Sequence, residues 1–320
     1  MNIEDIMIEK ELKIVFMGTP EFSVPVLKGL IENYNVKAIV TQPDKQVGRG
    51  GKIVSPPVKI VGEENNILVL QPSKIKLEYE EIIALEPDLI VTCAYGQIIP
   101  KELLDYPRYG CINVHASLLP KLRGGAPIHR AIINGDTKTG ITIMYMAEGM
   151  DDGDIISKEE IDILDTDTAS SLHDKLSMLG RTLLIKTLPS ILDGTNDRIK
   201  QDPSLVTFAP NIKPEDERID FSKTKKQIYN KIRGLNSWPG AYTTLEGKRI
   251  KVWESKIGEG YYTGALDGEI VNIYKDGIGV KVSNGEIIFT VIQVEGKSKM
   301  KVSDYLNGVD RNSLVGMTFK

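Results

Sequence analysis

The stretch GCINVHASLLP, residues 110–120, starts as a continuous apolar strand and breaks at a proline. Its apolar beginning is typical of a strand that is buried on both faces of a sheet. Its end carries an amide, Asn113, and an imidazole, His115. Side chains alternate along a strand, so these two groups point to the same face, and we expect them to line one cleft at the end of the strand.

The residues before this stretch repeat the strand pattern. Apolar runs alternate with helical stretches, in the order LKIVFMG (12–18), EFSVPVLKGLIEN (21–33), VKAIVTQ (36–42), ILVLQ (67–71), a helix near 77–85, and DLIVTCAYG (88–96). Buried strands separated by helices are what a parallel sheet covered on both faces requires. We therefore predict an α/β fold with a doubly wound, mostly parallel, Rossmann-like sheet. The first strand ends in MGTPEF without a GxGxxG fingerprint, which argues against a dinucleotide cofactor.

The pattern changes after a predicted helix over 169–193. Pro, Gly, Asn and Asp gather before residue 214, and we predict a linker at 204–214 between a catalytic domain, 12–203, and a second domain, 215–320. After one more helix over 224–235, short strands alternate with EG, DG and NG turns. Such spacing is typical of an antiparallel barrel, and we expect a small OB-like β-barrel.

Composition limits the class of protein. At 320 residues and 41% hydrophobic content, the chain is long enough for two domains. Its apolar runs are shorter than the ~20 residues that cross a membrane, and its first residues lack a secretory pattern, so we expect a cytoplasmic protein without a membrane partner. Cys93 and Cys111 each lie in an apolar run, which predicts buried thiols rather than a disulfide or a thiolate metal site.

Charge is distributed unevenly along the chain. The net charge is −4, yet residues 211–320 hold 18 Lys and Arg against 14 Asp and Glu, a balance of +4. A basic C-terminal third could steer a polyanion to one side of the protein. An ordinary solvated surface explains the same numbers equally well.

A carboxylate partner for His115 is expected from the next strand. GITIMYM (140–146) runs into AEGMDDGDI, where Asp151, Asp152 and Asp154 lie beside glycines. An imidazolium held by an aspartate, together with an amide donor, stabilises a developing oxyanion. The alternative for each residue alone is structural, because aspartates beside glycines shape turns and strand-end histidines bind loop backbone. The other two histidines, in helical segments, give no metal-site pattern, and we expect no metal.

Several long motifs resemble the folate-dependent formyltransferases. NVHASLLPKLRGGAPIHRAIINGD (113–136) and GMDDGD (149–154) resemble the signature of that family. VFMGTPEFSVPVL, VTQPDKQVGRGGKIVSPPVK, AYGQIIPKELLD and IRGLNSWPGA resemble the branch that acts on aminoacylated initiator tRNA. The resemblance runs from about residue 12 to the C-terminus and leaves residues 1–11 as an N-terminal extension.

The resemblance implies a function and a site. It implies transfer of the formyl group of 10-formyltetrahydrofolate to the α-amine of methionine on initiator Met-tRNA, without a metal, by a monomer. Asn113, His115 and Asp151 would surround the formyl carbon. The SLLP segment would line the folate site with Ser117, Leu118, Leu119 and Pro120. Residues 215–320 would be a tRNA-binding domain.

The loop QPDKQVGRGGKIVSPP, 42–57, has two interpretations. Its composition alone indicates a flexible surface loop, and its spacing is not that of a P-loop. In the resembled branch the loop reaches the acceptor stem, which implies tRNA binding by Lys45, Arg49 and Lys52. Two other functions stay open: a formyltransferase or hydrolase acting on a small amine, and a non-enzymatic RNA- or folate-binding module.

Overall fold

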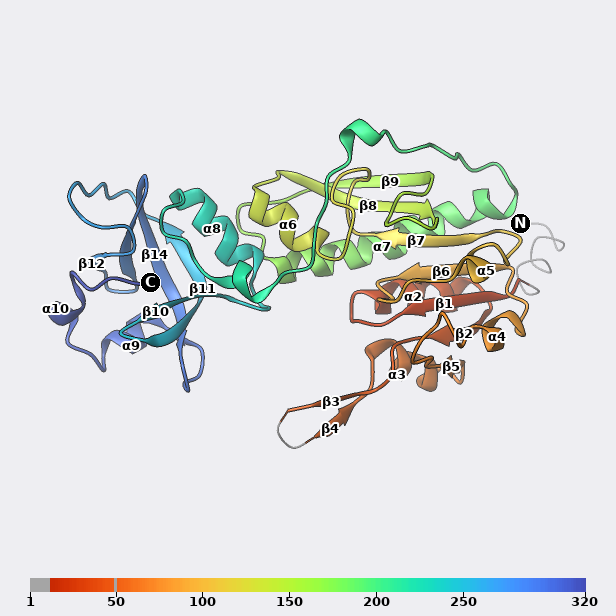
Figure 1. The fold of residues 1–320 in the computed structure, drawn as a ribbon, viewed down its shortest axis with the longest axis horizontal. Helices are drawn as coiled ribbons and strands as arrows, with labels where there is room; N and C mark the ends of the chain where they lie inside the picture. Colours follow the sequence, from red (N-terminus) through yellow and green to blue (C-terminus); the bar gives the residue numbers. More distant parts are fainter. Residues whose placement is uncertain (1–11, 49–50) are drawn as a thin grey trace. The chain divides into compact units, whose positions relative to one another are not determined.

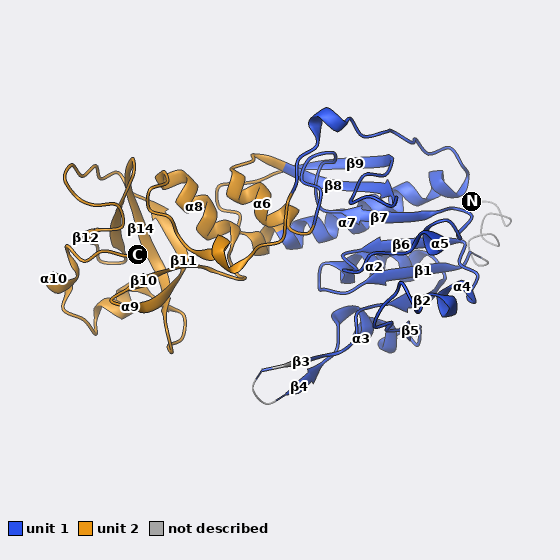
Figure 2. Ribbon diagram, viewed as in Figure 1, with its two compact units in different colours: residues 1–124, 139–161, 173–208 blue, residues 125–138, 162–172, 209–320 orange. Residues whose placement is uncertain are grey.

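The computed structural model describes residues 12–48 and 51–320 and divides them into two compact units (Figure 2). Unit 1 comprises residues 12–124, 139–161 and 173–208, apart from 49–50. Unit 2 comprises 125–138, 162–172 and 209–320. Each unit is therefore discontinuous in sequence, and the expected domain boundaries at 204–214 remain a prediction.

Unit 1 is built on a seven-stranded sheet in the order β5-β2-β1-β6-β7-β8-β9 (Figure 1). The strands are β1 (Ile14–Gly18), β2 (Val36–Val40), β5 (Leu68–Leu70), β6 (Leu89–Cys93), β7 (Cys111–His115), β8 (Lys138–Tyr145) and β9 (Ile155–Asp162). Pairing is parallel from β5 through to β7, whereas β8 runs antiparallel to β7. The predicted mostly parallel sheet is thus confirmed.

Helices cover both faces of this sheet. They are α2 (Ser23–Asn33), α3 (Pro57–Glu64), α4 (Glu80–Ile83), α5 (Lys101–Leu104) and α7 (Ala169–Leu192), of which α7 belongs to unit 1 from His173 onward. On one face, Val15 and Met17 of β1 pack in a core with residues of α4 and α5. On the other face, Gly180 of α7 lies against Val26 of α2 and Val114 of β7. Helices therefore pack on both faces of the sheet, and the doubly wound prediction is confirmed.

One local prediction in unit 1 is wrong, and one element there was not predicted. The helix expected near 77–85 is one turn, Glu80–Ile83, because Pro87 and the left-handed Glu86 (φ 49°) stop it. Residues on either side of the glycine-rich stretch form an antiparallel hairpin of β3 (Lys45–Val47) and β4 (Lys52–Val54), which the composition of the loop did not predict.

Unit 2 contains an antiparallel sheet in the order β10-β11-β14-β13-β12, with β15 on β14. The strands are β10 (Ala241–Leu245), β11 (Lys248–Ile257), β12 (Ile270–Ile273), β13 (Ile278–Val282), β14 (Gly285–Val294) and β15 (Met300–Lys301). The C-terminal segment joins the two edges: Lys320 exchanges backbone hydrogen bonds with Thr244 of β10, and the carbonyl of Met317 accepts from the N–H of Ile270 in β12. This segment closes the sheet, as the barrel prediction requires.

The helices of unit 2 are α6 (Pro127–Asn134), α8 (Lys225–Gly234), α9 (Val302–Leu306) and α10 (Arg311–Leu314). Helix α8 confirms the prediction over 224–235, and Thr224 and Gln227 form its capping box. Ile228 and Ile232 of α8 pack in the apolar core of the sheet, together with Phe289. No helix in the described ranges is long and apolar enough to cross a membrane.

Candidate active site

The end of β7 carries the candidate polar groups of unit 1. Cys111 packs in the α4 and α5 core, and strand alternation places Asn113 and His115 on that same face. Asn113 is half-buried, and His115 is only 6% exposed. A nearly buried imidazole requires polar partners from the surrounding loops.

Asp151 reaches His115 from the loop after β8. Because β8 is antiparallel to β7, its C-terminal Tyr145 lies opposite Ile112, and Thr142 lies opposite His115. Residues 146–154 then fold back and place Asp151 Oδ2 3.6 Å from His115 Nδ1. We call Asn113, His115 and Asp151 the polar cluster.

The two ring nitrogens of His115 face different groups. Nε2 lies 3.1 Å from the backbone carbonyl of Leu122, which can only accept, so Nε2 carries a hydrogen and donates it. Nδ1 faces Asp151 at 3.6 Å, which is longer than a hydrogen bond. Nδ1 is therefore the ring nitrogen that can exchange partners when a substrate enters.

The backbone holds Asp151 in a left-handed conformation, with φ 49°. Its Oδ2 accepts a 2.8 Å hydrogen bond from the backbone N–H of Gly124. Non-glycine residues adopt this conformation at a cost of roughly 1–2 kcal/mol, so surrounding contacts must hold it. The carboxylate is thereby directed at the imidazole and remains partly exposed, at 19% of its side-chain surface.

Thr92 of β6 orients the amide of Asn113. Its hydroxyl lies 2.9 Å from Asn113 Oδ1 and donates to it. The amide nitrogen, Nδ2, has no hydrogen-bond partner within residues 12–48 and 51–320. The arrangement leaves two N–H donors of a half-buried amide available at the end of β7.

The SLLP segment divides into buried and accessible residues. Ser117 is buried and donates to Lys121 O, and Leu119 is fully buried, with its N–H donating to Thr142 Oγ1. Leu118 and Pro120 are half-buried. Of the four residues implied to line a folate site, the latter two offer side-chain surface.

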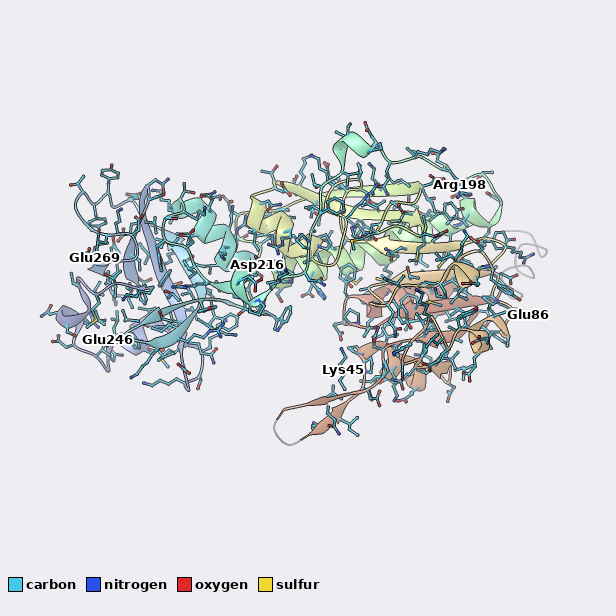
Figure 3. All side chains as sticks on the ribbon, viewed as in Figure 1. Lys45, Glu86, Arg198, Asp216, Glu246 and Glu269 are labelled. Atoms are coloured by element: carbon cyan, nitrogen blue, oxygen red, sulfur yellow. The ribbon has the colours of Figure 1, made fainter. Side chains whose placement is uncertain are left out.

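The β3–β4 hairpin projects from unit 1, and residues 45–46 and 52–54 of its strands are exposed (Figures 1 and 3). Lys45 and Lys52 are exposed cations, and Ile53 is 64% exposed beside them. Arg49 lies outside the described residues. At the base of the hairpin, Lys59 Nζ donates to Asp44, and this contact and one from the amide of Gln71 lower the pKa of the Asp44 carboxyl.

The remaining histidines and aspartates take other roles. Asp154 pairs with Arg198 at 3.3 Å, and Asp152 lies over Gly149 in the turn. His129, in unit 2, donates from Nδ1 to Gly234 O, and His173, in unit 1, packs edge-on against Phe22. In the described part of the chain, no group of three or more His, Cys, Asp and Glu could hold a metal ion.

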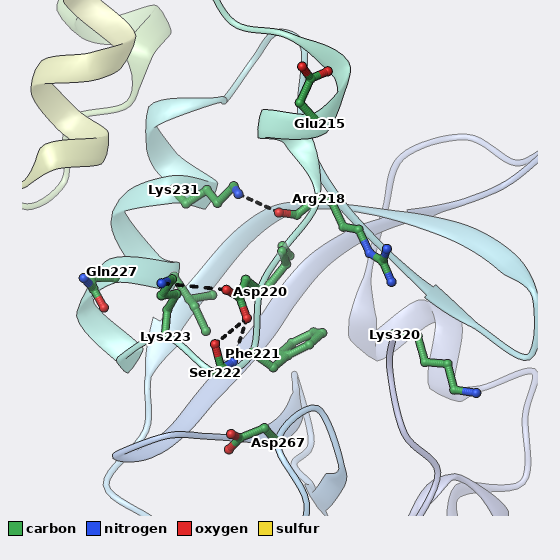
Figure 4. A pocket seen from close by; sticks show the side chains of 12 residues that line it. Glu215, Arg218, Asp220, Phe221, Ser222, Lys223, Gln227, Lys231, Asp267 and Lys320 are labelled. Atoms are coloured by element: carbon green, nitrogen blue, oxygen red, sulfur yellow. Dashed lines mark hydrogen bonds and ion pairs between the residues drawn. The ribbon is translucent and has the colours of Figure 1, made fainter.

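Unit 2 contains an open pocket of about 610 Å³ (Figure 4). Its charged lining is mixed and comprises Arg218, Lys223, Lys231, Lys320, Glu215, Asp220 and Asp267. Burial lowers the pKa of the Lys231 ammonium, which donates to the carbonyl of Arg218. The pocket brings four cations to one place without making it uniformly basic.

Sequence reasoning did not identify three contact residues of the polar cluster. Thr92, Leu122 and Gln201 hold its members through hydrogen bonds across separate segments. Leu122 acts through its backbone carbonyl, so its side-chain type carries no signal. Gln201 lies in the polar segment just before the predicted linker, and nothing in the composition of that segment points to the site.

The chain is similar to known proteins over most of its length. The family model "Formyl transferase" matches residues 12–188, and "Formyl transferase, C-terminal domain" matches 211–310. A methionyl-tRNA formyltransferase of Bacillus velezensis is 54% identical over 301 residues, covering 92% of this chain and 94% of the relative. The similar protein of Bacillus subtilis is 53% identical over 95% of this chain and 98% of its own.

Among solved structures, the N-formyltransferase of Helicobacter canadensis, in complex with folinic acid and dTDP-3-aminofucose, has a similar fold. Its TM-score is 0.67 at 20% identity, and the match covers 87% of this chain and 98% of that one. At this identity the likeness concerns the fold alone.

Proposed function

The chain belongs to the formyl transferase family, and on this premise we propose that it transfers the formyl group of 10-formyltetrahydrofolate to the α-amine of methionyl initiator tRNA. The polar cluster is the observation that carries the proposal. It combines an amide donor, an imidazole and a carboxylate at the end of β7. These are the groups that acyl transfer between two nitrogens needs, because charge develops on the formyl oxygen and a proton must change nitrogens.

In the proposed reaction, the neutral α-amine attacks the formyl carbon and a carbon–nitrogen bond forms. Negative charge develops on the formyl oxygen, where Asn113 Nδ2 and His115 Nδ1–H donate hydrogen bonds. Since Nε2–H is already bound by Leu122 O, Nδ1 alone can serve the oxygen. Asp151 stabilises the imidazolium that this donation requires.

Collapse of the tetrahedral intermediate breaks the bond between the formyl carbon and N10 of the folate. The proton lost by the attacking amine passes to N10, with the Asp151 carboxylate as the relay, directly or through a water molecule. The products are formyl-methionyl-tRNA and tetrahydrofolate. No step requires an external oxidant or reductant.

The folate donor is proposed to lie against the SLLP segment. Leu118 and Pro120 would supply apolar contact, while the buried Ser117 and Leu119 keep the segment in place through Lys121 O and Thr142. The tRNA is proposed to contact Lys45, Arg49 and Lys52 of the hairpin and, separately, unit 2. In unit 2 the cations of the pocket, Lys231 among them, suit phosphate groups.

The proposed substrate places the reaction in the cytoplasm, where aminoacylated tRNA is made and used, and we propose that the protein acts as a monomer. The unit 2 sheet supports a monomer, because its edge strands pair with the C-terminal segment of the same chain and are not open to a second copy. Sedimentation of the purified protein would check it.

The function is tested by comparing acceptors at saturating 10-formyltetrahydrofolate. We expect formyl transfer to Met-tRNA and none above background to free methionine or to an amino sugar nucleotide. Turnover with a small amine and not with Met-tRNA would support the small-substrate alternative. Folate or RNA binding without turnover would support the non-enzymatic one.

A further inference from the structure

The side-chain amide of Gln201 is fully used in hydrogen bonds within unit 1. Its Nε2 donates to the backbone carbonyl of Asp151 at 2.7 Å and to that of Gly153 at 2.9 Å. Its Oε1 accepts from Arg123 Nε at 3.1 Å and from Arg123 Nη2 at 2.8 Å. Carbonyls only accept and a guanidinium only donates, so the chemistry of the partners allows one orientation of the amide.

On one side, the amide holds the loop that carries Asp151. That residue has a left-handed backbone, which is unfavourable for a side chain other than glycine. Gln201 holds its carbonyl, and the N–H of Gly124 holds its carboxylate. Without the Gln201 contact, the carbonyls of Asp151 and Gly153 lose their shared donor, and the loop is free to relax to a conformation that turns the carboxylate away.

On its other side, the amide holds the loop that binds His115. Arg123 follows Leu122, whose carbonyl accepts from His115 Nε2. Leu122 also has a left-handed backbone, with φ 58°, and its N–H donates to Thr207 Oγ1. Gln201 therefore connects the loop that fixes one ring nitrogen of His115 to the loop that places a carboxylate opposite the other.

We propose that Gln201 is a positioning residue for formyl transfer, which keeps the Asp151 carboxylate directed at His115 Nδ1. It does not touch the reacting atoms. This inference rests on the proposed role of Asp151 in the reaction. It makes the rate of the chemical step, and not the affinity for either substrate, depend on an amide 50 residues away in sequence.

The test is a double-mutant cycle between Gln201 and Asp151. Gln201→Met keeps the length of the side chain and removes all four hydrogen bonds. In the otherwise unchanged protein we expect kcat for formylation of Met-tRNA to fall about tenfold or more, with KM for both substrates within about twofold. In the Asp151→Ala background the same substitution should change the residual rate by less than about twofold, because the group it positions is gone.

A second variant covers the case in which Gln201→Met does not fold. Gln201→Glu keeps an acceptor for Arg123 but sets its other oxygen against the carbonyls of Asp151 and Gly153. The ion pair with Arg123 favours folding, while the contact to the Asp151 loop is lost. We expect the same loss of kcat and the same insensitivity in the Asp151→Ala background.

The matched control is Gln293→Met in unit 2, where the amide accepts from Trp253 Nε1 and donates to the backbone carbonyl of Lys297. It should lower the melting temperature and leave kcat within about twofold. Equal losses for Gln201→Met in both backgrounds, or a rise in KM with unchanged kcat, would overturn the positioning role. Near-full activity of Asp151→Ala alone would overturn the proposed mechanism instead, so the two failures are distinguishable.

Discussion

In the polar cluster each side chain is held by neighbouring segments, whereas Lys45 and Lys52 of the β3–β4 hairpin are exposed to solvent. His115 is 6% exposed and is held through Leu122 O, while Ile53 of the hairpin is 64% exposed. Groups fixed before the substrate arrives stabilise a transition state without reorganisation. Exposed cations on an extended hairpin act by attracting a polyanion, and that attraction is weakened by salt. The two regions should therefore fail in different ways when they are altered.

The largest effect is expected in the polar cluster. His115→Ala removes the imidazole opposite Asp151 and should lower kcat/KM for formylation by at least ~100-fold, with little change in melting temperature. His129→Ala and His173→Ala are the controls, since these rings lie outside the cluster, and both should keep most of the activity. Near-full turnover of His115→Ala would show that the imidazole takes no part in the reaction.

The hairpin should respond to salt. Arg49→Ala is expected to impair formylation of Met-tRNA severely while folate binding stays within about twofold, a change of ~0.4 kcal/mol. Lys45→Ala and Lys52→Ala should each lower the slope of log kcat/KM against log salt by ~0.7–0.9, the value for one lost phosphate contact. An unchanged rate for all three variants would make the hairpin an idle surface element, and parallel losses for folate would assign it to the donor site.

An effect of intermediate size is expected when most of unit 2 is deleted. Deletion of residues 211–320 should leave folate binding in place, because the core around β1 lies entirely in unit 1, and should weaken the use of Met-tRNA. Helix α6 would lose its partner α8, because Gly234 of α8 packs closely against Ile133 of α6, so the melting temperature should fall by several degrees. Loss of folate binding by a truncated protein that is still folded would place part of the folate site beyond residue 210.

The smallest expected effect is on the reactivity of two buried thiols, Cys93 in β6 and Cys111 in β7, the strands that support the cluster. Burial raises the pKa of the Cys93 thiol from 9.0 to about 12 and raises that of Cys111 as well. Both should resist a thiol reagent at pH 8 until the protein unfolds, when two thiols react. Because the unfolded thiols ionise first, the stability linked to their burial is complete below pH ~9 and is lost as pH rises toward ~12. Rapid labelling of the native protein would show that β6 or β7 opens.

Part of the fold could be predicted from local pattern. Alternating apolar runs and helices indicated the sheet of unit 1, and the EG and NG turns indicated the antiparallel strands of unit 2. The antiparallel direction of β8 could not be predicted, since its residues are equally apolar in either direction. Strand direction depends on the path of the intervening segment, which periodicity does not describe.

The residues of the candidate site were also predicted only in part. Asn113 and His115 follow from strand alternation, and Asp151 from the turn after the next strand. Thr92 and Gln201 could not be found, because they contact the cluster across 21 and 50 residues of sequence. The hairpin strands were also missed, since glycine-rich composition masks two pairing segments of three residues each.

The most direct test of the account separates the chemical step from binding. The single-turnover rate of formyl transfer is measured with 10-formyltetrahydrofolate and Met-tRNA both saturating, for Asn113→Ala and for the double variant Lys45→Ala, Lys52→Ala. Asn113→Ala removes the amide whose Nδ2 is proposed to donate to the formyl oxygen, so its rate should fall at least ~100-fold. The hairpin variant should stay within about threefold of the unaltered protein, because saturation compensates for weaker binding. A near-normal rate for Asn113→Ala, or an equal loss in the hairpin variant, would contradict the division between a cluster that performs the reaction and a hairpin that binds the acceptor.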